Sequence, residues 1–254
     1  KKIKLVNNKI FYESHKFYGF LSKPLSKIDG VIVINNYLYS LHKELTLKSL
    51  FLAHDGVNLE EYNLIKDYEF QPNKKVYRVV YTGSLFQWKG VNTLVDSVKF
   101  LPINISLIFI GGSQQYLKDF QNYVNDSGYS SRIEIVPHIP KIELLEFIEV
   151  ADVLVLPNSA KDKMSLYTSP IKLFEYMASK RPIVASNIPS IEEVLSNKKD
   201  AYLFRSDDPK DLAIQINKAL TNDCSEMVNN AAKKSILYSW DKRAIDIGRV
   251  INNV

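Results

Sequence analysis

Residues 76–112 read VYRVVYTGSLFQWKGVNTLVDSVKFLPINISLIFIGG, and this stretch decides the fold. Residues 76–82 and 105–110 are short runs rich in β-branched and aromatic side chains, which favour strands. Between them, residues 91–100 have the wider apolar spacing that favours a helix. Both strand runs are apolar on both faces, which is typical of a parallel sheet covered by helices on two sides.

The same alternation continues to about residue 220. Further strands are predicted at residues 132–136, 153–156, 183–185 and 202–204, with helices at 115–125, 141–150, 170–179 and 209–220. Two more helices are expected at 227–236 and 244–251. Strands separated by helices in this order predict an α/β fold with a doubly wound, Rossmann-like parallel sheet and right-handed crossovers.

The first 55 residues repeat the pattern on a smaller scale, with strands expected at 9–12, 29–34 and 50–53 and a helix at 37–45. Residues 56–75 are polar and acidic, and this change in composition predicts a linker. We therefore expect residues 1–55 to be the C-terminal remnant of a first Rossmann-like domain and residues 76–237 to be the main domain. Residues 238–254 are expected to form a terminal helix that packs back toward the first domain.

Composition excludes several classes of protein. The chain has 254 residues, of which 46% are hydrophobic and 24% charged, an ordinary globular mixture. Its single cysteine excludes an intramolecular disulfide framework and a tetracysteine zinc site. No run approaches the ~18 apolar residues of a membrane-spanning helix. No apolar stretch with a cleavage site follows the basic residues 1–9, so we expect no secretory signal.

The net charge of +5 is concentrated at the start of the chain. Residues 1–28 hold seven lysines and one glutamate, interleaved with the aromatic residues Phe11, Tyr12, Phe17, Tyr18 and Phe20. This pattern favours contact with an anionic membrane surface, and a solvated chain start is the alternative. No arginine falls in the segment and no recognition-helix or zinc-finger spacing follows, so nucleic acid is not an expected partner.

Ligands of open α/β sheets bind beyond the carboxyl ends of the strands. The first such turn contains Gly83, which permits a close backbone approach, and leads to Lys89 at the entrance to the next helix. A lysine beside a helix start suits a phosphate, although the position taken alone favours a solvent-exposed lysine. The chain has no Walker loop, and Gly111-Gly112 lacks the third glycine of the dinucleotide fingerprint.

The most informative helix is preceded by Ser169-Pro170. Ser169 is a favoured N-cap and Pro170 suits the first helical position. The helix is apolar nearly all round except for Lys172 and Glu175, so we expect it to be buried. A buried carboxylate needs donors, for which sugar hydroxyls are suitable, and Lys172 suits a phosphate. A surface Lys172–Glu175 pair is the alternative.

Other polar residues carry less chemistry. The acidic pairs Glu192-Glu193 and Asp207-Asp208 fall at helix starts or turns, where we expect capping. No pair of carboxylates is placed for glycosidase chemistry. His42 and His54 are not spaced as metal ligands, so no metal is expected.

The ordered motifs carry a family resemblance. They are Gly83-Ser84-Leu85 with Trp88-Lys89-Gly90, Gly111-Gly112, Ala151-Asp152-Val153 with Pro157, Ser169-Pro170 with Lys172 and Glu175-Tyr176-Met177-Ala178, and Arg181-Pro182-Ile183-Val184-Ala185. In this order the chain resembles the family 4 (group 1) glycosyltransferases. The upstream residues 29–34 and 54–57 and the closing residues 238–240 also match, so the resemblance covers nearly the whole chain.

The resemblance implies the GT-B arrangement, in which two Rossmann-like domains face each other. The second, nucleotide-sugar-binding domain would be complete in residues 76–237, and the first, acceptor-side domain only partial. It also implies retaining transfer from a UDP- or GDP-sugar to a glycan or lipid-linked acceptor, without a further cofactor.

Individual residues inherit expected roles from this resemblance. Those near the donor diphosphate would be Gly83, Ser84, Lys89, Ser169, Pro170 and Lys172. Glu175 would hold the ribose hydroxyls, His138 and Ile139 would address the base, and His15 would be the catalytic residue facing the donor sugar.

Two positions depart from the family pattern. Tyr167 stands where the family carries a glutamate, so a carboxylate contact to the transferred sugar is absent, although Tyr167 and Thr168 would border that sugar. Ser84 stands where an arginine often pairs with the lysine, and Lys172 could replace its charge.

We therefore expect a retaining, metal-independent glycosyltransferase of surface polysaccharide, lipopolysaccharide or O-antigen synthesis. It would be cytoplasmic or peripheral at the inner face of the cell membrane. The alternatives are a non-catalytic nucleotide-sugar-binding half of a split transferase and a GT-B-type nucleotide-sugar epimerase.

Overall fold

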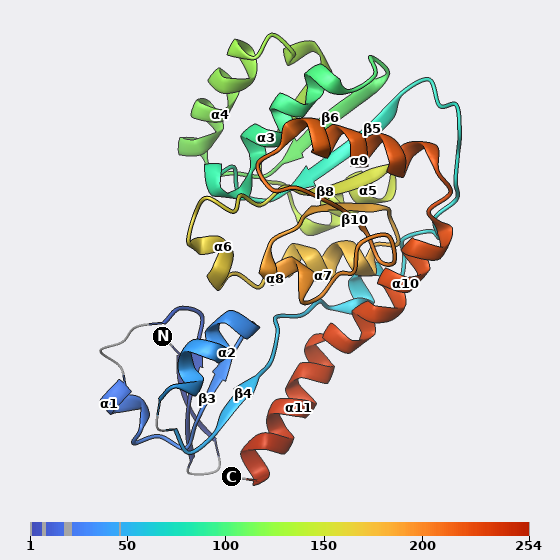
Figure 1. Cartoon of the computed structure of the whole chain (residues 1–254). Helices are drawn as coiled ribbons and strands as arrows, with labels where there is room; N and C mark the ends of the chain where they lie inside the picture. The colour runs from blue at the N-terminus through green and yellow to red at the C-terminus, as the bar shows by residue number, and fades with distance from the viewer. Residues whose placement is uncertain (1, 7–8, 18–21, 46, 254) are drawn as a thin grey trace.

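The computed structural model describes residues 2–6, 9–17, 22–45 and 47–253, and the strands within them form two sheets (Figure 1). The larger, six-stranded sheet has the order β10-β9-β8-β5-β6-β7, and all its pairings are parallel. Its strands are β5 (Tyr77–Thr82), β6 (Ile105–Ile110), β7 (Ile133–Val136), β8 (Val153–Leu156), β9 (Ile183–Ser186) and β10 (Tyr202–Phe204). The strand order reverses between β5 and β8, which confirms the predicted doubly wound, Rossmann-like sheet.

Helices cover both faces of this sheet because successive strand residues point to opposite sides. Val79 and Tyr81 of β5 pack in one core and Val80 in the other. One face is covered by α3 (Val91–Ser97), α4 (Gln114–Asp126) and α9 (Pro209–Thr221), and the other by α5 (Lys141–Glu149), α7 (Ile171–Ala178), α8 (Pro189–Glu192) and α10 (Ser225–Ser235). Within the described residues, no helix combines the length and the apolarity needed to cross a bilayer.

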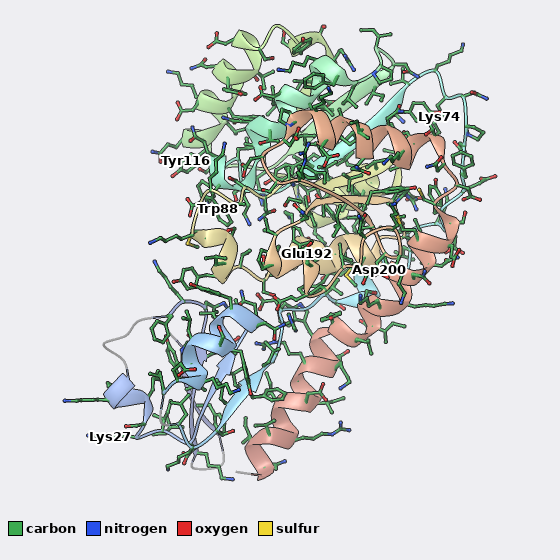
Figure 2. The ribbon with its side chains drawn as sticks, in the orientation of Figure 1. Lys27, Lys74, Trp88, Tyr116, Glu192 and Asp200 are labelled. Carbon is green, nitrogen blue, oxygen red and sulfur yellow. The ribbon has the colours of Figure 1, made fainter. Side chains whose placement is uncertain are left out.

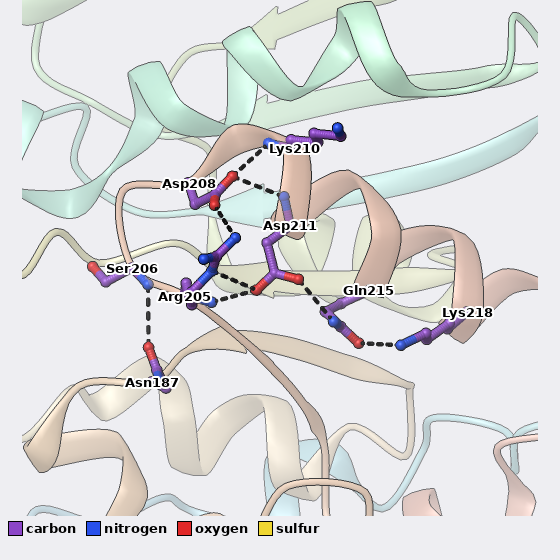
Figure 3. Close-up of polar contacts among 8 residues, drawn as sticks. All are labelled: Asn187, Arg205, Ser206, Asp208, Lys210, Asp211, Gln215 and Lys218. Atoms are coloured by element: carbon purple, nitrogen blue, oxygen red, sulfur yellow. Dashed lines mark hydrogen bonds and ion pairs between the residues drawn. The ribbon is translucent and has the colours of Figure 1, made fainter.

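The start of α9 shows what the acidic pair Asp207-Asp208 does. Asp208 accepts hydrogen bonds from the N–H groups of Lys210 and Asp211 at 3.0 and 2.9 Å, and Arg205 donates to its other oxygen at 2.7 Å (Figure 3). The side chain thus satisfies amides that the first turn leaves unpaired. The expected capping role is confirmed for Asp208.

The smaller sheet has the order β1-β2-β3-β4, formed by β1 (Lys2–Val6), β2 (Lys9–Ser14), β3 (Gly30–Val33) and β4 (Leu50–Leu52), with α1 (Ser22–Leu25) and α2 (Asn36–Lys43) between them. Strand β1 pairs antiparallel to β2 and was not predicted. Phe11 and Tyr12 of β2 are buried core residues. The interpretation of these two aromatics as part of a membrane-facing surface is therefore wrong; Tyr18 and Phe20 lie outside the described residues.

The chain end returns to the smaller sheet. The larger sheet with its helices is called the larger lobe, and the smaller sheet with α1 and α2 the smaller lobe. Helix α11 (Trp240–Asn253) runs from the larger lobe down to the smaller sheet (Figure 1), where Ile247 and Ile251 pack with Phe11. In the segment 56–75, Tyr62 and Ile65 are buried in a core of the larger sheet. The domain boundaries within this arrangement stay predictions.

Two glycines with similar backbone angles, Gly90 and Gly128, differ in how closely other backbone atoms pack against them. Gly90 and Gly128 have φ of +72° and +76°, but a Cβ on Gly90 would lie 1.7 Å from the Pro157 carbonyl oxygen, whereas a Cβ on Gly128 would meet nothing within 4 Å. We expect Gly128→Ala to cost about 1–2 kcal/mol for the left-handed backbone alone. Gly90→Ala should cost a further ~1–3 kcal/mol or more, because the clash is with backbone. Urea unfolding of both variants measures the difference, and equal losses would contradict the packing.

Candidate functional site

The turns that follow β5 and β6 lie against each other. The Gly83 N–H donates to the Ile110 carbonyl at 2.8 Å, and a Cβ on Gly111 would lie 2.5 Å from the Gly83 oxygen. Gly83 and Gly111 have φ of +145° and +121°, a backbone region that residues other than glycine rarely adopt. The Tyr176 hydroxyl of α7 accepts a hydrogen bond from the Thr82 N–H at 2.8 Å and so anchors the end of β5, where the Gly83 turn begins.

Two adjoining cavities of about 400 and about 610 Å³ open along this carboxyl edge. They share the turn residues Thr82, Gly83 and Ser84 together with Lys172, so they meet at this turn, and the two together are called the cleft. Leu156 at the end of β8 also lines the first cavity, which therefore lies where the strand order reverses. Of the residues singled out from the sequence, the first cavity gathers Gly83, Ser84, Lys89, Thr168, Ser169, Pro170, Lys172 and Glu175, and the second gathers Gly83, Ser84, His138, Ile139 and Lys172.

Lys89 brings an uncompensated charge into the first cavity. It ends the short 3-10 helix η3 (Gln87–Lys89), and its ammonium lies 4.0 Å from the centre of the Trp88 ring. No carboxylate within the described residues forms an ion pair with it. Burial, and then the neighbouring charge of Lys172, lower the pKa of Lys89 to about 8. An unpaired, partly buried ammonium in a cleft is a candidate anion contact.

Glu175 is held by protein groups rather than left unpaired. Its carboxylate lies 2.5 Å from the Lys141 ammonium and 3.6 Å from that of Lys172, and its side chain is 15% exposed. Lys141 also donates to the Tyr62 hydroxyl at 2.8 Å. Burial alone would raise the pKa of Glu175, but the two lysines lower it below its ordinary value. The Lys172–Glu175 pair of the second alternative is present, but it is largely buried rather than on the surface. The contacts with Lys141 and Tyr62 were not predicted, because these residues come from distant segments.

Aromatic rings form one wall of the second cavity. Phe86 and Tyr116 both line it and meet edge to face with ring centres 4.6 Å apart. Trp88 stacks on Phe86 at 6.4 Å, and Figure 2 shows Trp88 and Tyr116 at the same edge of the molecule. Such a wall offers apolar surface to a planar ring.

Two residues singled out from the sequence lie outside both cavities. His15 places its Nε2 3.4 Å from a Glu13 carboxylate oxygen, and its side chain is 54% exposed. Tyr167, at the end of α6 (Met164–Tyr167), packs edge to face on Tyr37 of α2 with ring centres 5.5 Å apart. The catalytic role of His15 therefore stays a prediction.

Ser169 differs from its expected role as a helix cap. Pro170 is the N-cap of α7, and no side chain caps the helix. The Ser169 hydroxyl instead accepts a hydrogen bond from the Asp55 N–H at 3.1 Å. The helix starts one residue later than predicted, which leaves this hydroxyl free to join the two lobes.

Comparisons with known proteins agree with this geometry. The chain is 23% identical over 243 residues to an uncharacterized glycosyltransferase of Methanocaldococcus jannaschii, covering 95% of this chain and 64% of that protein. It is 23% identical to a processive diacylglycerol alpha-glucosyltransferase of Acholeplasma laidlawii, covering 85% of this chain and 65% of that protein. The structure of Anabaena HepE in complex with UDP and glucose matches with a TM-score of 0.77 at 16% identity, over 96% of this chain and 71% of that one. The chain thus spans slightly less than two thirds of the length of the two relatives.

Fold and cleft together define a GT-B type, Rossmann-like α/β protein. The family model "Glycosyl transferases group 1" matches residues 65–235, and the chain belongs to this glycosyltransferase family. The resemblance stated from the sequence motifs is confirmed.

The lowered pKa of Lys89 predicts a pH-dependent cost to stability. The unfolded chain keeps this proton up to about pH 10.5 and the folded chain releases it near pH 8, so the stability that this residue contributes rises with pH between those values. Lys89→Met should therefore stabilise the fold below pH 8 by roughly 1–3 kcal/mol, with no difference above about pH 10.5. Urea unfolding across this pH range measures it. The exposed Lys118→Met on α4 is the control, and equal behaviour of the two variants would contradict the assignment.

Proposed function

We propose that the cleft binds a nucleoside-diphosphate sugar and that the protein transfers this sugar to an acceptor with retention and without a metal ion. The observation that carries the proposal is the convergence of Lys89 and Lys172 on the glycine turn, in the cavity at the reversal of strand order. A Cβ on Gly83 would lie 2.9 Å from Lys172 Cε, so the lysine side chain lies directly over this turn.

The two ammonium groups suit the chemistry of a leaving nucleoside diphosphate. Negative charge builds on that group as the bond to the sugar breaks, and preorganised cations stabilise it. The start of α7 adds partial positive charge from the N–H groups of its first turn, from Ile171 onward, in the same cavity. The position of Lys172 over the Gly83 turn supports the hypothesis that this lysine replaces the positive charge missing at Ser84.

The remaining parts of the nucleotide find matching groups along the cleft. The Glu175 carboxylate lies 3.6 Å from the Lys172 ammonium, and this position supports a contact with the ribose hydroxyls. These hydroxyls would donate to the same carboxylate that Lys141 contacts. The second cavity, with His138, Ile139 and the aromatic wall, supports a place for the base. UDP and GDP both fit this description.

The acceptor is proposed to be a glycan or lipid-linked sugar of surface polysaccharide synthesis. The name of the Acholeplasma laidlawii relative, a diacylglycerol glucosyltransferase, supports a lipid-linked acceptor. Transfer by the protein alone would exclude the non-catalytic alternative, and isomerisation of the donor without an acceptor would support the epimerase.

Nucleotide binding should stabilise the fold. At a hundredfold excess over its Kd, a ligand adds about 2.7 kcal/mol, so UDP or GDP should raise the melting temperature by several degrees. Lys89→Ala and Glu175→Ala should each remove this rise, whereas Lys118→Ala on the exposed side of α4 should keep it. Differential scanning fluorimetry measures the effect. No shift with either nucleotide at millimolar concentration would refute the donor site.

The early lysines predict a separate, salt-dependent contact. Lys16, Lys23 and Lys27 are exposed and carry charge beside the smaller sheet. Anionic vesicles should retain the protein at low salt and release it at high salt, because ions screen exposed charges. Co-sedimentation tests this, and equal retention on neutral vesicles would argue against it.

A further inference from the structure

Two polar side chains of the first cavity lack a hydrogen-bond partner within the described residues, and neither was singled out for a role. Asp55, between β4 and η2 (Leu59–Tyr62), is 8% exposed and lines the cavity. Within the described residues, its carboxylate makes no hydrogen bond or ion pair. Asn158, after β8, is 1% exposed and lines the same cavity, and its buried Nδ2 has no hydrogen-bond partner in the described part of the chain. A buried polar atom without a hydrogen-bond partner, such as Asn158 Nδ2, is rare and costly. The Asp55 carboxyl interacts electrostatically with His15 and Arg243, but neither forms a hydrogen bond with it.

The backbone at Asp55 is fixed from both sides. The Val57 N–H donates to the Tyr238 carbonyl at 2.9 Å, and a Cβ on Gly56 would lie 2.6 Å from that oxygen. The Asp55 N–H donates to Ser169 at 3.1 Å. The backbone that carries the carboxylate is therefore held in place before any ligand arrives.

Arg243 of α11 strengthens this position. Its Nε donates to the His54 carbonyl at 2.8 Å, and its terminal nitrogen lies 2.7 Å from the Glu13 carboxylate. Glu13 in turn neutralises the guanidinium, so Arg243 holds the backbone next to Asp55 without pairing with the Asp55 carboxylate.

Tyr167 does not supply the carboxylate that is expected at its position, and Asp55 can supply one instead. The resemblance implies a carboxylate at residue 167 facing the transferred sugar, but Tyr167 packs on Tyr37 outside the cavity. The cavity has cations at Lys89 and Lys172 and, besides Glu175, one further carboxylate, that of Asp55. With the lysines on the diphosphate and Glu175 on the ribose, Asp55 and Asn158 are left for the sugar beyond the diphosphate.

We propose that Asp55 and Asn158 recognise the transferred sugar of the donor, with the Asp55 carboxylate accepting from one hydroxyl and Asn158 Nδ2 donating to another. This inference rests on the proposed function and deepens it. A carboxylate at this point selects a neutral, hydroxyl-bearing sugar and disfavours a uronic acid, since like charges repel in a buried site.

The test compares sugar nucleotides with the bare nucleotide. Calorimetric titration uses UDP, UDP-glucose, UDP-galactose, UDP-N-acetylglucosamine and UDP-glucuronic acid, with GDP and GDP-mannose alongside. In the unmodified protein, at least one neutral sugar nucleotide should bind more tightly than its bare nucleotide, and UDP-glucuronic acid should not. Asp55→Asn should lower the affinity for that sugar nucleotide by about 10–100-fold, the loss expected for a charged hydrogen bond, and leave the affinity for the bare nucleotide unchanged.

Two further variants keep the result interpretable. Asn158→Ala should weaken the same sugar nucleotide by about 10-fold or less, and Asp119→Asn on the exposed side of α4 should change nothing. Thermal melting establishes that each variant is folded. If a bare nucleotide binds but Asp55→Asn weakens it as much as the sugar nucleotide, or weakens neither, the sugar assignment is overturned while the donor site stands. If no nucleotide binds, the proposed function and this inference fall together.

Discussion

The partly buried ion pair of Glu175 and Lys141 is the interaction on which the cleft depends. An isolated carboxylate inside an apolar helix would be strongly destabilising, and Lys141 at 2.5 Å offsets that cost. Lys141 begins α5, and its second partner, Tyr62, comes from the segment between the two sheets. The pair therefore connects three segments that are far apart in the sequence. It also fixes α7, whose Tyr176 holds the Thr82 turn.

The charge of Lys89, unlike that of Glu175, is not compensated by an opposite charge. Glu175 sits beside two cations, whereas Lys89 has a ring beneath it and a second lysine as its nearest charge. The folded protein thus tolerates a desolvated, repelled ammonium at the point where the glycine turns bring the backbone close. Such a cost is usual at binding sites, where groups are arranged for a ligand and not for the stability of the empty fold. A bound anion would relieve both the burial and the repulsion.

Local patterns were sufficient to predict most of the fold. The strands of the larger sheet and their helices match within a few residues, because each is a periodic run bounded by turn residues. Strand β1 was not predicted, because Lys2 and Lys4 interrupt the apolar residues of Lys2–Val6 and leave no continuous apolar run. The cleft edge was predictable from the strand ends, but its contacts were not. Lys141 and Glu175 are 34 residues apart and Asp55 and Ser169 are 114 apart, and nothing local encodes such pairs.

The contacts between the lobes show that the first cavity depends on both sheets. The loop before α7 is held by the smaller lobe, where Asn35 donates to the Leu166 and Thr168 carbonyls at 3.0 Å each. The same Asn35 caps α2 through its other side-chain atom, so the loop and that helix share one anchor. Because α11 returns to pack on the smaller sheet, moving either lobe would strain the loop that carries Ser169. The geometry of the cavity is therefore set by lobe docking, while Lys89, Lys172 and Glu175 of the larger lobe and Asp55 of the segment after β4 supply its charges.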